Sequence, residues 1–323
     1  DTINFTTDGD LTKDDSVDGG DGTDTVDIDT DSSLTGSGKV TLTNVERVTL
    51  EASNDSGAFA AFDASGIASL TTLTVSGDSD DAAYSITNLV DDAQVRFEAE
   101  ATTTAVTVDT AGDSLTLNAA GDTTTTVTVS DAVSVVVSAH TAAINDFAAL
   151  VLDDDATTTL SLTGSTNDGS DLLTGNITGS NLLSSITATT NTTGGLITVG
   201  TIVDGDALTS VVANADYGNI SFGALAGTGT AEGLTTLTAT ADNGATTTFG
   251  AITADTTNST SDVTTTVTGT ASTAGSTVAL GSLTSTYGIV NGTFSGAGVV
   301  GSTLISSEHI DLTISTGSAS THA

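Results

Sequence analysis

The chain has 323 residues and a formal net charge of −37, with 41 Asp and Glu against four basic side chains, Lys13, Lys39, Arg47 and Arg96. A hydrophobic fraction of 37% with only 14% charged residues excludes the apolar-poor, highly charged composition that stays disordered, so the chain should fold. The negative charge argues against nucleic acid or an anionic membrane as a partner, and the lack of Cys excludes disulfides and thiolate metal sites.

The first segment of the chain is its most acidic, because residues 1–31 contain eleven Asp. No Lys or Arg follows Arg96, so salt bridges within the molecule cannot balance the charge of the later residues. Cations from outside must screen or neutralise it. We expect calcium as the cofactor, since calcium prefers carboxylate and carbonyl oxygens. We therefore divide the chain into an acidic calcium-binding segment, residues 1–50, and a Thr/Ser-rich assembly region, residues 51–323.

A calcium-binding motif lies inside the acidic segment. Residues 19–27 read GGDGTDTVD, which matches the β-roll nonapeptide G-G-x-G-x-D-x-U-x at every specified position. Glycines permit a tight turn with inward carbonyls, Asp24 adds a carboxylate, and the apolar Val26 begins a strand. The preceding nine residues, 10–18, can be aligned with this nonapeptide although they lack its glycines, and Asp15 then aligns with Asp24. The alternative is an ordinary Asp-Gly turn. The predicted metal ligands are Asp15, Asp18, Gly20, Asp21, Gly22, Asp24 and Asp27.

Short segments with apolar residues two apart follow from Val40 onward, separated by Gly, Asn and Asp turns, for example at 106–108, 115–117, 127–129, 135–137, 150–152 and 160–162. The piece LTTLT at 70–74 returns at 234–238, which indicates a degenerate repeat. We predict an all-β parallel β-solenoid, because the core lacks large aromatics, the turns lack Pro, and outward Thr and Ser can stack between coils. Tandem β-sandwich domains are the alternative.

Two stretches need separate predictions. Residues 139–150 carry Ile144 and Phe147 near helical spacing and predict one or two helical turns. Residues 256–275 are rich in Thr, Ser and Gly, but Val263 and Val267 favour further strands over a disordered linker. Acidic turns at 153–155, 204–206 and 167–172 are secondary calcium candidates, and each is read as a solvated turn.

Three pieces of the chain, in order, carry a family resemblance: DGGDGTDTVDID at 18–29, NVERVTLEAS at 44–53 and FDASGIASLTTLTVSGD at 62–78. Together they resemble surface-layer and adhesin-like proteins of the repeats-in-toxin (RTX) type in Gram-negative bacteria. The resemblance implies a calcium-dependent β-solenoid, exported without a cleaved N-terminal signal by a one-step type I system and assembled at the cell surface. The chain differs from such proteins in two ways, since it has a single intact nonapeptide and no recognisable C-terminal secretion signal. These differences indicate that the chain is part of a longer precursor.

The sequence predicts a structural protein and not an enzyme, since no Ser/His/Asp array, nucleotide loop or Cys nucleophile can be identified. The expected function is a secreted subunit that self-assembles with calcium into a surface layer or filament, with other copies and cell-surface polysaccharide as partners. The lack of Cys, Met and Trp suits an exposed extracellular protein, and no apolar stretch is long enough for a membrane span. The alternative is an adhesin or stalk segment that presents a ligand-binding domain.

A Thr-lined face that binds ice is a minor variant, motivated by threonines at 102–104 and 123–126. It requires a regular Thr-x-Thr ladder, and the spacing along the sequence is irregular.

Overall fold

The computed structural model describes residues 1–5, 11–12, 14–29, 40–52, 62–77, 83–98, 105–110, 112, 114–120, 126–139, 144–152, 156–164, 171–191, 193–203, 207–226, 233–253, 264–285, 289–306 and 309–316. These residues are nearly all in strands, and one 3₁₀ turn, η1 (Ala64–Gly66), is the only helical element among them. Every strand pairing in this part of the chain is parallel. The fold is therefore a parallel β-solenoid, as predicted, and the tandem-sandwich alternative is excluded.

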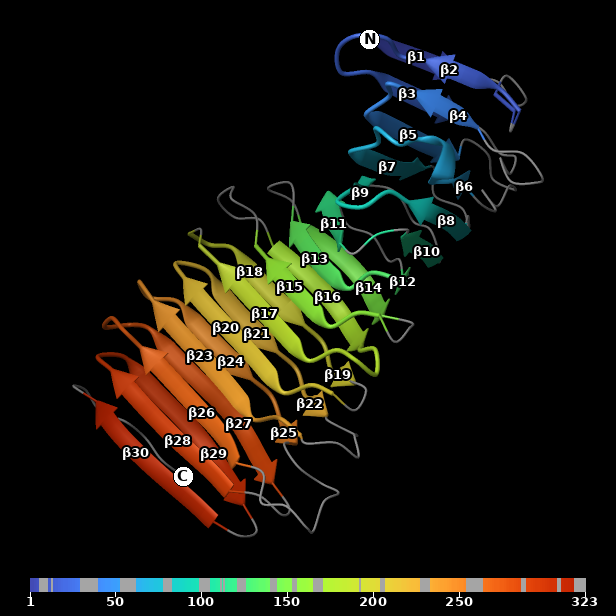
Figure 1. Ribbon diagram of the computed structural model, residues 1–323. Helices are drawn as coiled ribbons and strands as arrows, with labels where there is room; N and C mark the ends of the chain where they lie inside the picture. The colour runs from blue at the N-terminus through green and yellow to red at the C-terminus, as the bar shows by residue number, and fades with distance from the viewer. Residues whose placement is uncertain are drawn as a thin grey trace.

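The first sheet contains fourteen strands in chain order. They lie side by side along the molecule, with the first and last of them at its opposite ends (Figure 1). The strands are β1 (Thr2–Phe5), β3 (Thr25–Asp29), β5 (Arg47–Ala52), β7 (Thr72–Gly77), β9 (Gln94–Glu98), β11 (Ser114–Ala120), β13 (Ser134–Ala139), β15 (Thr159–Thr163), β17 (Ser185–Thr190), β20 (Ser210–Asp216), β23 (Thr236–Asp242), β26 (Thr264–Ala271), β28 (Ile289–Gly296) and β30 (His309–Thr316).

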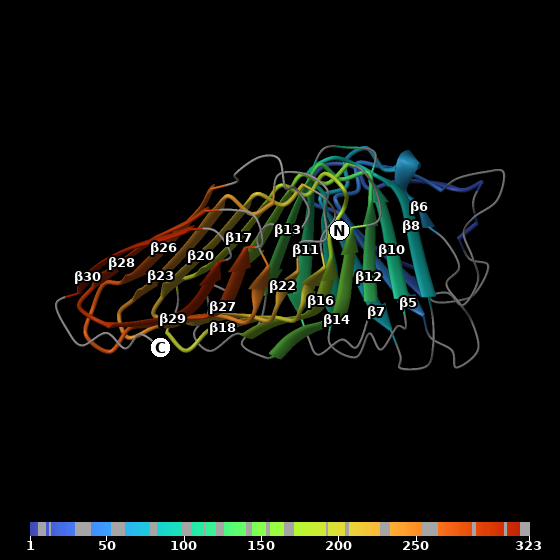
Figure 2. The ribbon, with the colours of Figure 1, turned by 90° about the horizontal axis from the view of Figure 1, so that it is seen from below.

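The second sheet also has fourteen strands and faces the first across the core, as the view from below shows (Figure 2). A separate two-stranded sheet pairs β2 (Ser16–Asp18) with β4 (Thr41–Thr43). The strands of the second sheet are β6 (Phe62–Asp63), β8 (Ala83–Leu89), β10 (Ala105–Thr110), β12 (Thr126–Ser130), β14 (Ile144–Leu152), β16 (Asp171–Thr178), β18 (Leu196–Val199), β19 (Ile202–Val203), β21 (Asn219–Phe222), β22 (Leu225–Ala226), β24 (Thr246–Phe249), β25 (Ile252–Thr253), β27 (Thr277–Ser285) and β29 (Val299–Ser306).

The coils differ in length although their strands stay in register. Ser114 pairs with Ser134 and Thr236 pairs with Thr266, so the second of these coils contains clearly more residues than the first. The two LTTLT pieces occupy the same place in the coil, since Leu73 and Leu237 both lie near the start of a strand of the first sheet. The first sheet also continues across residue 50, because β5 spans that predicted boundary and pairs with β3 and β7.

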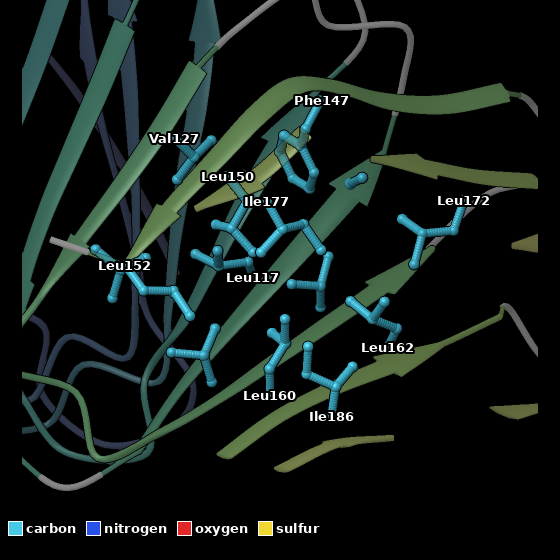
Figure 3. Close-up of a cluster of buried hydrophobic side chains, with 14 of the residues drawn as sticks. Leu117, Val127, Phe147, Leu150, Leu152, Leu160, Leu162, Leu172, Ile177 and Ile186 are labelled. Atoms are coloured by element: carbon cyan, nitrogen blue, oxygen red, sulfur yellow. The ribbon is translucent and has the colours of Figure 1, made fainter. Parts of the chain in front are cut away.

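Alternating side chains from both sheets build a core between them that is mainly aliphatic. Contrary to the expectation of a core without large aromatics, it also buries Phe62, Phe97, Phe147, Phe222, Phe249 and Phe294. On β15 the inward Leu160 and Leu162 are buried while the residues between them are partly exposed. They meet Phe147, Leu150 and Ile177 from the second sheet (Figure 3). Burial of such side chains from water drives the coils to stack.

The helix predicted for residues 139–150 is wrong, because Ala139 ends strand β13 and Ile144–Leu152 forms strand β14. Phe147 and Leu150 are both buried, and the two residues between them, Ala148 and Ala149, are exposed or half-buried. This local irregularity places inward residues three apart and so imitates a helical period. The order predicted within 256–275 is confirmed for β26, and residues 256–263 lie outside the described part.

The same irregularity recurs down the second sheet as a column of glycines, where each strand bends between two inward residues. An added Cβ on Gly223 would lie 2.7 Å from the carbonyl oxygen of Gly200, and one on Gly250 would lie 2.8 Å from the carbonyl carbon of Gly223. Such backbone approach leaves no room for a side chain. This repeat was not predicted from the sequence. It reads VGTI, FGAL, FGAI and LGSL at 199–202, 222–225, 249–252 and 280–283.

Thr and Ser hydroxyls form a ladder at the corner that leads into the first sheet. Each hydroxyl donates to a backbone carbonyl one coil earlier: Ser184 to Thr158 at 3.0 Å, Thr209 to Ser184 at 3.2 Å and Thr235 to Thr209 at 3.1 Å. The same carbonyls also accept backbone amides of the next coil, so each hydroxyl adds a further donor to a carbonyl that is already paired. Part of the high Thr and Ser content therefore holds neighbouring coils together.

Candidate calcium site

The glycine-rich turn adopts the conformation that the nonapeptide predicts. Gly20 has φ of 88° and Gly22 has φ of 127°, values that side-chain-bearing residues rarely adopt. Gly19 is required for space, since a Cβ there would lie 2.2 Å from the carbonyl oxygen of Asn44. The turn ends at Asp24, and β3 begins at the next residue.

Asp24 is the buried carboxylate of this turn, with only 1% of its surface exposed. Its Oδ1 accepts a hydrogen bond from the amino terminus of Asp1 at 2.8 Å. Its Oδ2 is buried and has no hydrogen-bond partner. A buried carboxylate oxygen without a donor is costly, and a bound cation would remove that cost.

Glu46 lies one coil from Asp24 and binds the same turn. Its Oε2 accepts from the backbone amide of Asp24 at 2.8 Å, and its own amide donates to the Asp24 carbonyl at 3.2 Å. Thr25, which follows Asp24, is paired in the first sheet with Arg47, which follows Glu46. Glu46 is not among the predicted ligands, although it lies directly before β5, as Asp24 lies directly before β3.

Three further predicted ligands, Asp18, Asp21 and Asp27, differ in their surroundings, and Asp18 already has partners in the protein. Asp18 Oδ1 accepts from the Gly20 amide at 3.1 Å and from Asn44 Nδ2 at 2.8 Å. Asp21 is exposed. Asp27 lies half-buried on β3, in register with Asn4 on one side and Thr49 on the other. Asp18 therefore shapes the turn, and Asp27 faces outward on the first sheet.

Asp15 does not stack on Asp24 as the nonapeptide alignment predicts. Ser16, which follows Asp15, pairs with Thr41 in the two-stranded sheet, whereas Thr25 belongs to the first sheet. The reason is coil length, since the residues that stack on the Asp24 turn lie a whole coil away and not one nonapeptide away. The amide and hydroxyl of Thr12 donate to Asp15 Oδ2 at 2.7 and 2.8 Å and hold the pKa of Asp15 below its ordinary value.

The chemistry at Asp24 fits a hard cation, because carboxylate oxygens of Asp24 and Glu46 lie at the same turn. No group of three or more His, Asp or Glu side chains that could hold a metal lies within the described residues. Further ligands would have to be backbone carbonyls. Of the secondary candidates, 153–155, 204–206 and the first four residues of 167–172 lie outside the described part of the chain, and Asp171 and Leu172 begin strand β16.

Fold and site together define an acidic parallel β-solenoid with a glycine-aspartate turn near its amino-terminal end. Scans against protein-family models, curated proteins and solved structures find no match for this chain. Within the residues that the structure describes, no helix is long and apolar enough to cross a membrane.

Asp24→Asn should weaken calcium-dependent stabilisation more than Asp21→Asn, because Asp24 is buried with a carboxylate oxygen free whereas Asp21 is exposed. Calcium at about a hundred times its Kd adds roughly 2.7 kcal/mol to the wild type. Thermal melts in calcium and in chelator measure this increment for each variant. We expect Asp24→Asn to lose most of it and Asp21→Asn to keep it. Equal losses would contradict the assignment of Asp24.

Proposed function

We propose that this protein is a secreted structural subunit that self-assembles, with calcium, into a cell-surface layer or an extracellular filament. The observation that carries the proposal is the charge distribution, since a long solenoid carries 41 acidic and four basic side chains. Residues after Arg96 supply no ammonium or guanidinium group to pair with a neighbouring copy. Copies that approach one another therefore need shared cations to offset like-charge repulsion.

The buried Asp24 carboxylate supports calcium as that cation. A cation between Asp24 and Glu46 would join two neighbouring coils at a turn that glycines make narrow. Exposed carboxylates elsewhere on the surface would bind further calcium more weakly and between copies. In this proposal calcium both orders the acidic segment and allows assembly, and catalysis plays no part.

Export to the cell surface by a type I system is the proposed location, and it rests on the RTX-like resemblance of residues 18–78. Anchoring to surface polysaccharide would complete such a layer. An adhesin or stalk segment that presents another domain remains the second candidate, because a solenoid also serves as a rigid spacer.

Assembly should disappear on chelation and return with calcium, because association of subunits with a charge of −37 requires bridging cations. Electron microscopy and light scattering of the full chain measure this directly. Sodium chloride should substitute poorly, since screening lowers repulsion without supplying coordination. Ordered sheets or fibres that appear only with calcium support the proposal. Polymers that persist in excess chelator at low salt would remove cation bridging from it, and soluble monomers that bind a ligand would favour the adhesin.

A further inference from the structure

The outer face of the first sheet carries a two-dimensional array of hydroxyl groups over six strands, β15 to β28. Each strand places three outward residues in register with those of its neighbours. Fifteen of the eighteen positions are Ser or Thr, none is charged, and all are partly or fully exposed. We call these positions the hydroxyl face: Thr159, Ser161, Thr163, Ser185, Thr187, Thr189, Ser210, Val212, Asn214, Thr236, Thr238, Thr240, Thr266, Thr268, Thr270, Asn291, Thr293 and Ser295.

The array is regular in space although its sequence spacing is not. Thr238 and Thr268 are neighbours across β23 and β26, just as Thr187 and Val212 are neighbours across β17 and β20, although the first pair is farther apart in the chain. The loops absorb these differences, so no register shift interrupts the pairings from β15 to β28. Neighbouring positions therefore repeat at about 4.8 Å across the strands and about 6.7 Å along them.

Many hydroxyls of this face are free to bond to an external surface. The three outward residues of each strand form three columns across the sheet. In the middle column, the hydroxyls of Thr187, Thr238, Thr268 and Thr293 make no hydrogen bond within the described part of the protein. Each such threonine also presents a methyl group. The nearest carboxylates on β20 and β23, Asp216 and Asp242, lie beyond the third column at the strand ends.

Among the residues that the structure describes, the second sheet offers no comparable face. Several of its strands are divided by the glycine column into short pairs such as β21 and β22. Its outward positions include the apolar residues Val151 and Val203, which lie in one row through Thr178. The hydroxyl face is therefore specific to one side of the solenoid.

The size and chemistry of the hydroxyl face do not fit a second protein copy. Six strands of five residues cover about 500 Å², below the roughly 800 Å² per partner of a standard interface. The face also lacks the aromatic and Arg anchors that dominate protein interfaces. An uncharged lattice fits this face better than a second protein copy does, if its groups bond to hydroxyls at the same two spacings. Such a lattice satisfies each hydroxyl without bringing a second negative charge near.

We propose that the hydroxyl face binds ice. Its two repeats are close to the oxygen repeats on the prism faces of hexagonal ice, so rows of threonine hydroxyls can bond to successive surface waters while the methyl groups lie between them. Uncharged side chains favour this contact, since carboxylates would hold liquid-like hydration shells. This activity is independent of the proposed assembly.

The test compares the full chain in calcium with a Thr238→Tyr/Thr268→Tyr double variant. Two rings in the middle column would hold the face away from a flat lattice. Thr248→Tyr on β24 is the matched control, because Thr248 is also half-buried and outward but belongs to the second sheet of the same coil. Recrystallisation inhibition and the fraction of protein entering slowly grown ice are measured, and circular dichroism melts confirm that the variants fold.

We expect the wild type and Thr248→Tyr to enter ice and slow recrystallisation, and the double variant to lose about tenfold in effect. Exclusion of the wild type from ice would overturn the inference and leave the assembly proposal standing. Equal behaviour of the double variant and the control would also overturn it. A double variant that changes only the sedimentation of assembled copies would identify the face as an interface between copies instead.

Discussion

Phe249→Ala should lower the free energy of unfolding by about 4 kcal/mol, the middle of the range for deleting a buried aromatic ring. Phe249 is 1% exposed and stacks on Phe222 of the preceding coil with ring centroids 4.9 Å apart and planes 5° apart. The first-sheet strands of these coils bury Val211 and Leu237, but their other inward residues are the small Ala213, Ala215, Ala239 and Ala241. The two rings therefore fill the space between the sheets that the small alanine side chains leave open. Deletion of one ring leaves a cavity there.

Guanidinium unfolding measures this loss, and hydrogen exchange locates it. Protection should fall first in β21, β24 and their neighbours, because each coil contacts mainly the coils beside it. Leu182→Ala is the control, since Leu182 is 46% exposed and its loss should change stability by less than about 0.5 kcal/mol. Similar effects from both substitutions would show that Phe249 does not fill the core in this way.

Gly223→Ala should destabilise the solenoid by about 2–3 kcal/mol, because the new methyl group would meet backbone atoms and not a movable side chain. The methyl carbon would lie 2.7 Å from the Gly200 oxygen and 2.8 Å from the Gly200 carbonyl carbon. The Gly223 amide donates to the Val199 carbonyl at 2.8 Å, so the strands cannot separate without losing that bond. Relief of the clash would disturb the bend in both coils.

Ser221→Ala is the control for this prediction, since Ser221 lies close to Gly223 on the preceding strand and faces outward. Denaturant midpoints should fall clearly for Gly223→Ala and hardly change for Ser221→Ala. If Gly223→Ala were neutral, the glycine column would not be a packing requirement. Its recurrence at 200, 223, 250 and 281 would then need another reason.

The sequence determined the fold class because its information is local. Alternation such as Val135-Val136-Val137 places one face inward, and β-branched residues favour strands. The absence of Pro and scarcity of large aromatics indicated a narrow stacked core. The nonapeptide likewise located a tight glycine turn, since Gly20 and Gly22 carry positive φ as the motif requires. The calcium expected at that turn stays a prediction.

The tertiary structure alone decided which turns stack, because stacking depends on coil length and coil length depends on loops that sequence periodicity does not report. Asp15 therefore lies apart from Asp24, and Glu46, a whole coil later, takes the neighbouring position. The same cause hid the hydroxyl face, whose threonines are a full coil apart in the chain and adjacent in the sheet. Local composition sets strand and turn, whereas registry between coils is fixed only when the core closes and every strand pairs.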